Sequence, residues 1–334
     1  MKRNPVLCFC KKLLTFFLSV LLLSLAVFSI SRLAPGDPLV SYYGEGAEKM
    51  SALEKEAARE KLGLNDAIHI QYIRWLENAV KGDFGISYKY KQDVLEVIRQ
   101  RAGNTLLLGG VGFLLTFAGA LCLGLVCAWH EDRWLDRLLC KCGTLLSCIP
   151  EFWLSLLLIL VFSVLLPILP SSGAYGIGQQ GDLLSRLEHL ILPLTAVVLG
   201  HIWYYAYTVR NKLLEEIRED YVLMGKLKGL SRHRVFWSHC LPNIMPTYLS
   251  LMALALPHIL GGTYIVETVF GYPGIGALCY ESARYHDYNL LMVLCLITGT
   301  LVILCNLISQ WINQGIDPRL RPEGAEASEV TFLE

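Results

Sequence analysis

The apolar residues of this chain are gathered into long runs that are separated by shorter polar segments. Five runs are long enough to cross about 30 Å of hydrocarbon as helices. They cover about 13–31, 105–128, 145–167, 190–209 and 290–312. A sixth run, at about 248–266, is interrupted only by Pro257 and His258. The pattern predicts an all-α integral membrane protein with six transmembrane helices.

Basic residues in the polar segments predict which side of the membrane each segment occupies. Short loops rich in Lys and Arg remain in the cytoplasm. The N-terminus and the 129–142 segment hold several basic residues and the 210–247 segment holds seven, whereas 170–189 has only Arg186 and 267–289 has only Arg284. Six spans with both termini in the cytoplasm satisfy this alternation.

A cleaved signal peptide is the alternative interpretation of the first apolar run. Such peptides usually have an apolar stretch of about 7–15 residues, and the run at 13–31 is longer. Its removal would also leave five spans and an outside C-terminus. We therefore expect the first run to remain as a span.

Composition supports a membrane location and argues against other classes. Hydrophobic residues make up 54% of the 334 residues and charged residues 17%, which is too apolar for an ordinary soluble domain. Basic and acidic residues balance at 29 each, so no net charge favours nucleic acid. Of the 11 cysteines only Cys279 is expected outside, and the close pairs Cys8/Cys10 and Cys140/Cys142 lack metal-site spacing. We expect no disulfide framework and no metal site.

The polar insert at 35–103, between the first two spans, is expected to fold outside the membrane as a small helical cap. Ser51 and Glu54 have the spacing of a capping box before a helix that ends near Gly63. A second helix is expected to end before Gly82, with an apolar face formed by Tyr72, Ile73, Leu76, Ala79 and Val80. A third, short helix is expected around Val94, Leu95 and Ile98. Such a cap is either a structural lid or a docking surface for an external protein.

The polar segment at 210–247 has the pattern helix, break, helix. The residues from Asp220 onward predict a short amphipathic helix, with Val222, Leu223 and Leu227 together, that stops at Gly229. Ser231 is a candidate N-cap for a second helix ending near Leu241 and Pro242. The first helix either lies on the membrane surface or inserts into a groove on another protein.

This segment resembles the cytoplasmic loop of the permease subunits of ABC importers. Gly229, Leu241 and Pro242 match the glycine and the Leu-Pro of that loop, whereas 223–225 (LMG) stands where the family has Glu-Ala-Ala and His239 replaces an isoleucine. Further matches are similar to the dipeptide, oligopeptide and nickel branch. They are 32–38 (RLAPGDP), 62–64 (LGL), 71–72 (QY), 75–76 (WL), 82–87 (GDFGIS), 149–154 (IPEFWL), 169–173 (LPSSG), 219–222 (EDYV), 261–262 (GG), 267–276 (ETVFGYPGIG) and 317–321 (DPRLR). The resemblance covers roughly residues 10–321.

The resemblance implies a membrane subunit that works in an assembly in the plasma membrane of a prokaryote. Its expected partners are a homologous second permease, two ATP-binding-cassette ATPase subunits, an extracytoplasmic solute-binding protein and the lipid bilayer. ATP and Mg would be bound by the ATPases, and this chain would bind no cofactor. The resemblance implies a coupling helix made by Asp220, Tyr221, Val222, Leu223, Met224, Gly225, Leu227, Gly229 and Leu230. The cargo would be a peptide or nickel. The overall similarity of the segments 84–87, 152–154 and 261–263 to nickel permeases favours nickel or a nickel chelate.

The expected organisation follows from these assignments. Residues 1–34 form an N-terminal cytoplasmic segment and the first span, and 35–103 form the external cap. Residues 104–312 form a five-helix permease core that includes the coupling loop at 210–247, and 313–334 form a cytoplasmic tail.

Few residues within the spans are polar enough to suggest a translocation path. Ionisable groups in a span are costly and indicate function by default. The candidates are Glu151, His201 and His258, together with Gly261 and Gly262, which permit close helix approach. Each also has an ordinary interpretation: Glu151 can reach the interface, and the histidines can form hydrogen bonds between helices.

Two other classes of function are considered. The chain has no phosphate-binding Gly-x4-Gly-Lys-Ser/Thr motif, so it would not hydrolyse ATP itself, and an ATPase-independent channel or secondary transporter is the alternative. A membrane enzyme would need a catalytic set, and neither His-Glu-x-x-His nor Gly-x-Ser-x-Gly is present.

Overall fold

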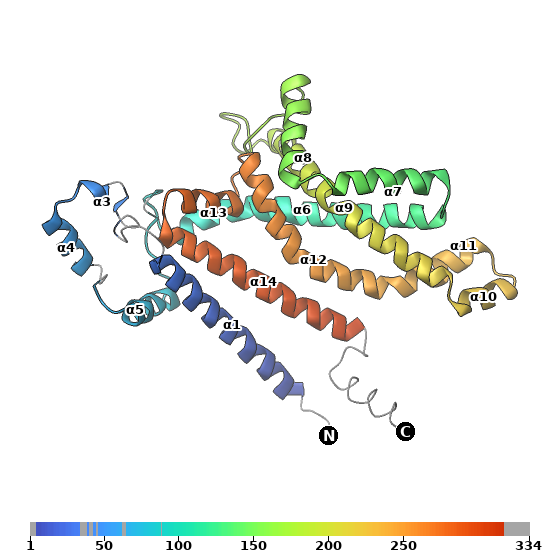
Figure 1. Ribbon diagram of the computed structural model, residues 1–334, viewed down its shortest axis with the longest axis horizontal. Coiled ribbons are helices and arrows are strands. Elements are labelled where there is room, and N and C mark those ends of the chain that lie inside the picture. Colours follow the sequence, from blue (N-terminus) through green and yellow to red (C-terminus); the bar gives the residue numbers. More distant parts are fainter. Residues whose placement is uncertain are drawn as a thin grey trace. The chain divides into compact units, whose positions relative to one another are not determined.

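The computed structural model describes residues 5–33, 39, 43–44, 46–61, 65–87 and 89–316. These residues fold almost entirely as helices (Figure 1), and their only strand-like pairing is an isolated bridge between Ile86 and Asp93. Residues 62–64 and 317–321, which contribute to the family resemblance, lie outside the described residues, as does most of the expected tail.

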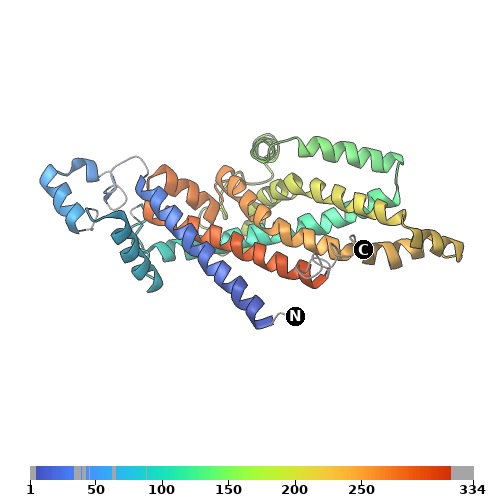
Figure 2. The ribbon, with the colours of Figure 1, turned by 60° about the horizontal axis from the view of Figure 1, so that its bottom comes forward.

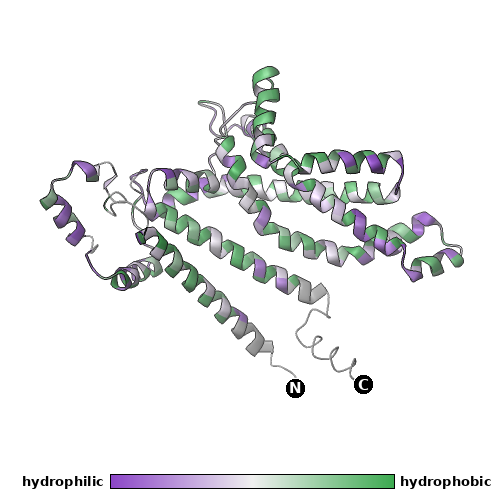
Figure 3. Cartoon of the chain, viewed as in Figure 1, coloured by the Kyte–Doolittle hydropathy of each residue, from purple (hydrophilic) through white to green (hydrophobic). Residues whose placement is uncertain are grey.

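Among the described residues, five helices are long and apolar enough to cross a membrane. They are α1 (Pro5–Leu33), α6 (Val94–Trp129), α9 (Leu183–Ile217), the run Arg232–Val269 that includes α12 (Leu241–Val269), and α14 (Tyr288–Ile316). Figure 3 shows α1 and α14 to be apolar along most of their described length. A bent pair made by α7 (Trp134–Ser147) and α8 (Glu151–Ile159) with its π-helical continuation η1 (Leu160–Leu165) supplies a sixth span if it is counted as one. The all-α membrane fold is therefore confirmed.

The third apolar run is not the single straight helix that its hydropathy predicts. The chain bends by 98° between α7 and α8. Pro150 precedes α8, and a proline disfavours helical backbone in the residue before it, which explains why α7 ends at Ser147. The expectation of a loop over 129–142 is also wrong, because α7 begins at Trp134 and only 130–133 connect it to α6.

The described chain divides into two compact units. Unit 2 runs from Leu106 to Tyr272 and resumes at Cys305. Its core forms where α9 contacts α7, α8 and α12. The ring centres of Phe117 and Tyr205 lie 4.6 Å apart. The Phe117 carbonyl oxygen accepts a hydrogen bond from the Tyr248 hydroxyl at 2.5 Å. Gly143 allows α7 to approach α9, because a β-carbon there would lie 1.8 Å from the Trp203 ring.

Unit 1 comprises residues up to Thr105 together with Pro273–Leu304. Its described residues contain α1, the first part of α6, the first part of α14 and four shorter helices. These are α3 (Gly46–Lys49), α4 (Ala52–Lys61), α5 (Ile68–Val80) and α13 (Ile275–Arg284). Figure 2 shows α1 beside the first part of α14. Gly299 makes this possible, because a β-carbon there would lie 2.6 Å from the side chain of Leu23.

Two of the expectations for the helices of the insert are confirmed and one is wrong. The capping box is confirmed: the Ser51 N–H donates to Glu54 at 2.8 Å, and the Glu54 N–H donates to Ser51 Oγ at 3.3 Å. The helix before Gly82 is confirmed as α5, and Gly82 itself has φ +85°. The third short helix is wrong, because Val94 opens the 36-residue helix α6, whose sequence contains no proline that would interrupt it.

Candidate coupling segment and translocation face

The short helix α10 (Asp220–Leu227) ends at a well-formed glycine cap. Gly229 has φ +78°, a conformation that favours glycine. The Gly229 N–H donates to the Lys226 carbonyl at 2.9 Å, and the Leu230 N–H donates to the Gly225 carbonyl at 3.1 Å. This pair of bonds is the Schellman pattern, which satisfies carbonyls that a helix end would otherwise leave unpaired. The predicted stop at Gly229 is confirmed.

One side of α10 packs against the rest of unit 2, and another side is exposed. Val222 is 2% exposed, whereas Leu223, Met224 and Leu227 are 58%, 54% and 75% exposed. The expectation that Val222 shares a face with Leu223 and Leu227 is therefore wrong. We call Leu223, Met224 and Leu227 the α10 apolar patch. Figure 1 shows α10 beyond the end of α9, and Figure 2 agrees.

Hydrogen bonds to one carboxylate connect α10 with two membrane-length helices. Glu216, near the end of α9, accepts from the Tyr221 hydroxyl at 2.7 Å and from the Asn243 side chain of α12 at 2.9 Å. Burial and the bond to Glu216 raise the pKa of Tyr221, so its hydroxyl keeps its proton and continues to donate. These hydrogen bonds would therefore transmit a displacement of α10 to both α9 and α12.

The second helix of the segment begins as predicted but does not end as predicted. Ser231 Oγ accepts from the Arg234 N–H at 3.3 Å and caps α11 (Arg232–Val235). The helix continues through a π-helical turn, η2 (Phe236–Cys240), directly into α12, so no end occurs near Leu241 and Pro242. Pro242 lies in the first turn of α12, where the missing N–H of proline is tolerated. The break between helices is therefore confined to 228–231.

Two arginines hold this segment against the ends of neighbouring helices. Arg232 donates to the Trp129 carbonyl at 2.7 Å, and its guanidinium lies 4.7 Å from the centre of the Trp129 ring. Arg218 pairs with Glu131 at 2.6 Å. The helix–break–helix segment is thus held by contacts on α6 and on the connection that follows it.

The structure brings two of the predicted path residues together. Glu151 Oε1 and His201 Nδ1 lie 4.0 Å apart, with side chains that are 15% and 21% exposed. The same ring nitrogen lies 2.9 Å from the Val197 carbonyl oxygen, and Glu151 Oε1 is buried without a hydrogen-bond partner among the described residues. The pair joins the start of α8 to α9.

The other predicted path residues lie on α12. His258 and Gly261 are exposed, and a β-carbon at Gly261 would meet nothing within 4 Å. Gly262 belongs to the same helix, but its surroundings lie outside the described residues.

Sequence reasoning missed a polar stripe that includes His258 and Gly261. Residues at helical spacing of three or four make one face of α12, and all of them are exposed except Ser250, which is half-buried. They are Asn243, Thr247, Ser250, Leu254, His258 and Gly261. We call them the α12 stripe. Its spacing of three and four residues is visible in the sequence.

A small cavity marks the middle of the α12 stripe. Its volume is about 180 Å³, and it lies between α9 and α12. Thr208 and Lys212 line it from α9, and Thr247, Ser250 and Leu254 line it from α12. The hydroxyls of Thr208 and Ser250 donate to carbonyl oxygens of their own helices, those of Tyr204 and Pro246, so the surface of the cavity is mostly apolar.

A buried ion pair between α7 and α9 was also missed. Arg210 donates to both carboxylate oxygens of Asp136 at 2.7 Å, and Asp136 is 1% exposed. Cys127 and Cys140 place their sulfur atoms within 4.8 Å of this carboxylate. Because Arg210 and the Asp132 N–H already occupy the carboxylate oxygens, we interpret the group as a structural clamp. The ion pair was missed because 129–142 was expected to be a loop, whereas Asp136 lies on α7.

Comparison with known proteins adds the family. Residues 120–322 match the model of the binding-protein-dependent transport system inner membrane component. The chain belongs to this family. It is 33% identical over 294 residues to the oligopeptide transport system permease protein AppB of Bacillus subtilis, covering 88% of this chain and 92% of that protein. It is 30% identical over 316 residues to the metal-staphylopine import system permease protein CntB of Staphylococcus aureus, covering 94% and 98%.

A solved structure supports the fold independently. A chain from a structure of the MetNI methionine ABC transporter in inward-facing conformations superposes with a TM-score of 0.54 at 17% identity, covering 67% of this chain and 97% of that chain. This similarity concerns the fold alone. The family match and the two relatives confirm the resemblance to ABC-importer permeases of the peptide and nickel branch. The protein is a multi-pass membrane transport subunit of a prokaryotic ABC importer.

Proposed function

We propose that this chain forms half of a translocation path and couples it to separate ATPase subunits through α10. The observation that supports coupling most directly is the α10 apolar patch. Leu223, Met224 and Leu227 are exposed on a helix whose other side is fixed by Val222 and by the Tyr221–Glu216 hydrogen bond. An amphipathic helix that is fixed on one side and exposes apolar residues on another can insert those residues into a groove on another protein.

The contacts of α10 also provide a route for the movement. ATP and Mg on the partner ATPases would draw the α10 helices of the two permeases together. The shared carboxylate of Glu216 would transmit that displacement to α9 and, through Asn243, to α12. Because α10 is clamped at its ends, it would move as a rigid body rather than fold or unfold.

The α12 stripe supports the position of the path. Polar side chains in a span face protein or a water-filled space rather than lipid. Most residues of the stripe are exposed in this chain, so a homologous second permease would supply the opposite wall. Glu151 and His201 would lie outside this wall and connect α8 with α9.

The remaining features of the assembly follow from the family. We place both termini in the cytoplasm and the insert outside, where an extracytoplasmic solute-binding protein would deliver the cargo. This chain would bind no cofactor. The relatives named above include an oligopeptide permease and a metal-staphylopine permease. The cargo would be a peptide or a metal chelate, and we favour a nickel chelate from the appearance of 84–87 and 152–154.

Coupling is tested by charging the α10 apolar patch. Leu227→Glu should abolish co-purification of the ATPases and transport-linked ATP turnover, because a carboxylate cannot be buried in an apolar groove without a partner. Lys228→Ala is the matched control at the next, exposed position and should retain both. Uptake in vesicles that lack the ATPases would instead support the channel or secondary transporter and would defeat the proposal.

The cargo is tested separately with the partner binding protein. Calorimetry should show binding of a nickel complex, or else of a short peptide. Binding of neither would remove both candidates and leave the coupling result untouched.

A further inference from the structure

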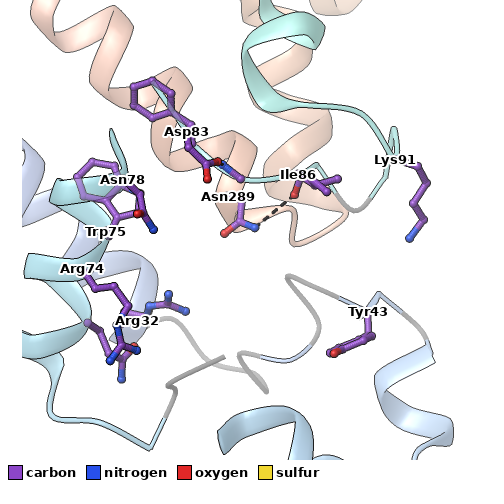
Figure 4. A pocket seen from close by; sticks show the side chains of 12 residues that line it. Arg32, Tyr43, Arg74, Trp75, Asn78, Asp83, Ile86, Lys91 and Asn289 are labelled. Atoms are coloured by element: carbon purple, nitrogen blue, oxygen red, sulfur yellow. Dashed lines mark hydrogen bonds between the residues drawn. The ribbon is translucent and has the colours of Figure 1, made fainter. Parts of the chain in front are cut away.

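A cavity of about 530 Å³ opens within unit 1. Its wall includes Arg32 at the end of α1, Arg74 and Trp75 of α5, and Phe84 and Lys91 of the following turns. Figure 4 shows Arg32, Arg74, Trp75 and Asn78 gathered on one side, with Lys91 across from them. The volume is that of a typical small-molecule site.

The charges of this wall favour an anion. Three basic residues line the cavity against one carboxylate, Asp83, which already accepts the Gly85 N–H at 2.9 Å. Arg74 is paired with Asp66 at 2.9 Å, outside the lining. Among the described residues, the three basic side chains exceed Asp83 and Asp66 by one positive charge.

Two donors in the wall lack partners. Arg32 Nε and Trp75 Nε1 are buried and make no hydrogen bond with any described residue. The Arg32 guanidinium lies 5.2 Å from the Phe28 ring, a contact that holds the group but satisfies no N–H. A buried donor without a partner costs free energy, and an oxyanion that displaced the atoms covering these two groups would remove that cost.

The position of the cavity selects the source of the anion. Only 11% of the apolar window of α1 is buried by this chain, so most of its surface is available to lipid, and Arg32 lies in its last turn. The neighbouring helix α5 exposes Ile73 and Val80, at 54% and 82%. Arginine and tryptophan at the end of a span, beside an amphipathic helix, are typical of the level of lipid headgroups.

We propose that this cavity binds the phosphate of a membrane phospholipid in the leaflet at the C-terminal end of α1. Arg32 and Trp75 donate to the phosphate oxygens, and Lys91 faces the same charge. The acyl chains extend along the exposed side of α1, where Ile30 and Leu33 are 68% and 74% exposed. The bound lipid would then hold α5 against the end of α1.

The test uses the detergent-purified importer complex, stripped of lipid and titrated with dioleoylphosphatidylglycerol, with native mass spectrometry as the readout. Arg32→Gln should weaken retention about tenfold, the effect of losing one charge-assisted hydrogen bond. Trp75→Phe keeps the aromatic ring, removes the N–H and should weaken retention by a smaller factor. Arg99→Gln is the matched control, because Arg99 is exposed in the same unit and does not line the cavity. It should retain lipid as the unchanged protein does.

Three outcomes would overturn the proposal. The first is unchanged retention in both Arg32→Gln and Trp75→Phe. The second is an equal loss in Arg99→Gln, which would show general charge attraction. The third is inorganic phosphate displacing the lipid at millimolar concentration, which would identify a free-ion site. Thermal unfolding of each variant checks folding, and if Arg32→Gln does not fold, Trp75→Phe decides the result.

Discussion

The Leu230 N–H donates to the Gly225 carbonyl oxygen at 3.1 Å, which closes α10 across Gly229. This bond fixes the direction in which the chain leaves α10 and enters α11. It also places Leu230 against Gly225, where a β-carbon would lie 3.6 Å from a Leu230 methyl group. The geometry of the coupling segment therefore depends on the backbone conformation of one residue.

Replacing Gly229 tests that dependence. Space around it is open, so the cost of a side chain comes from φ +78° alone, about 1–2 kcal/mol for a residue with a β-carbon. Gly229→Val should lower transport-linked ATP turnover severalfold, because the two helices lose their fixed angle. Gly229→Asn is the control and should keep most activity, since asparagine tolerates this conformation. Equal activity in both variants would show that the break is not required.

The α12 stripe predicts a position-specific block. Thr247→Trp should lower cargo uptake by about tenfold or more while the assembly still purifies intact, because the ring would fill the space beside Ser250 that we assign to the path. Leu249→Trp, two residues away on another face of α12, should be tolerated. A loss of uptake only in Leu249→Trp would place the path on the other face.

The Asp136–Arg210 pair predicts strong coupling between two buried charges. Asp136→Leu should lower the free energy of unfolding by about 3–5 kcal/mol, because it leaves the Arg210 guanidinium buried without its partner. The double variant with Arg210→Leu should lose less than this single variant. Thermal unfolding of the detergent-purified protein measures both. Losses that simply add would contradict the clamp.

Glu281 predicts an acid-sensitive contact in unit 1. Burial opposes ionisation, but the hydrogen bonds from Lys89 at 2.8 Å and Tyr90 at 2.5 Å hold the pKa of Glu281 below its ordinary value of 4.5. A lowered pKa in the folded state means that the contribution is complete above pH 4.5 and is lost as pH falls through the folded value. The groups are partly exposed, so the loss should be at most about 1 kcal/mol.

Hydrogen exchange near residues 89–95, measured between pH 6 and pH 3, follows this loss. The intrinsic rate of amide exchange also changes with pH. Because that change is the same in the unchanged protein and in Glu281→Gln, comparison of the two at each pH cancels it. That variant should show weaker protection at pH 6 and little further change on acidification. An identical pH profile in the variant and the unchanged protein would exclude the role of Glu281.

The sequence predicted most of what hydropathy and local caps determine. The runs that became α1, α6, α9, α12 and α14 were evident because a span needs a long apolar stretch. The capping box at Ser51 and the stop at Gly229 were evident because each depends on neighbouring residues alone. The bend at Pro150 could be suspected from the proline, but its angle depends on how α8 packs on α9.

The missed features depend on contacts between distant residues or on exposure. Asp136 and Arg210 are 74 residues apart, and no local pattern marks them as partners. The continuation of α11 into α12 past Pro242 required the π-helical turn at Phe236–Cys240. The predicted apolar face of α10 was wrong for Val222, because the residues of unit 2 that pack on α10 determine which of its side chains are buried.

Photo-crosslinking in the assembled importer tests the central claim most directly. A photoreactive residue at Leu227 of the α10 apolar patch should form an adduct with an ATPase subunit. The same residue at Ile177, which is fully exposed between η1 and α9, should form none. Adducts of position 227 with lipid alone would show that α10 lies on the membrane surface and would contradict its role as the coupling helix.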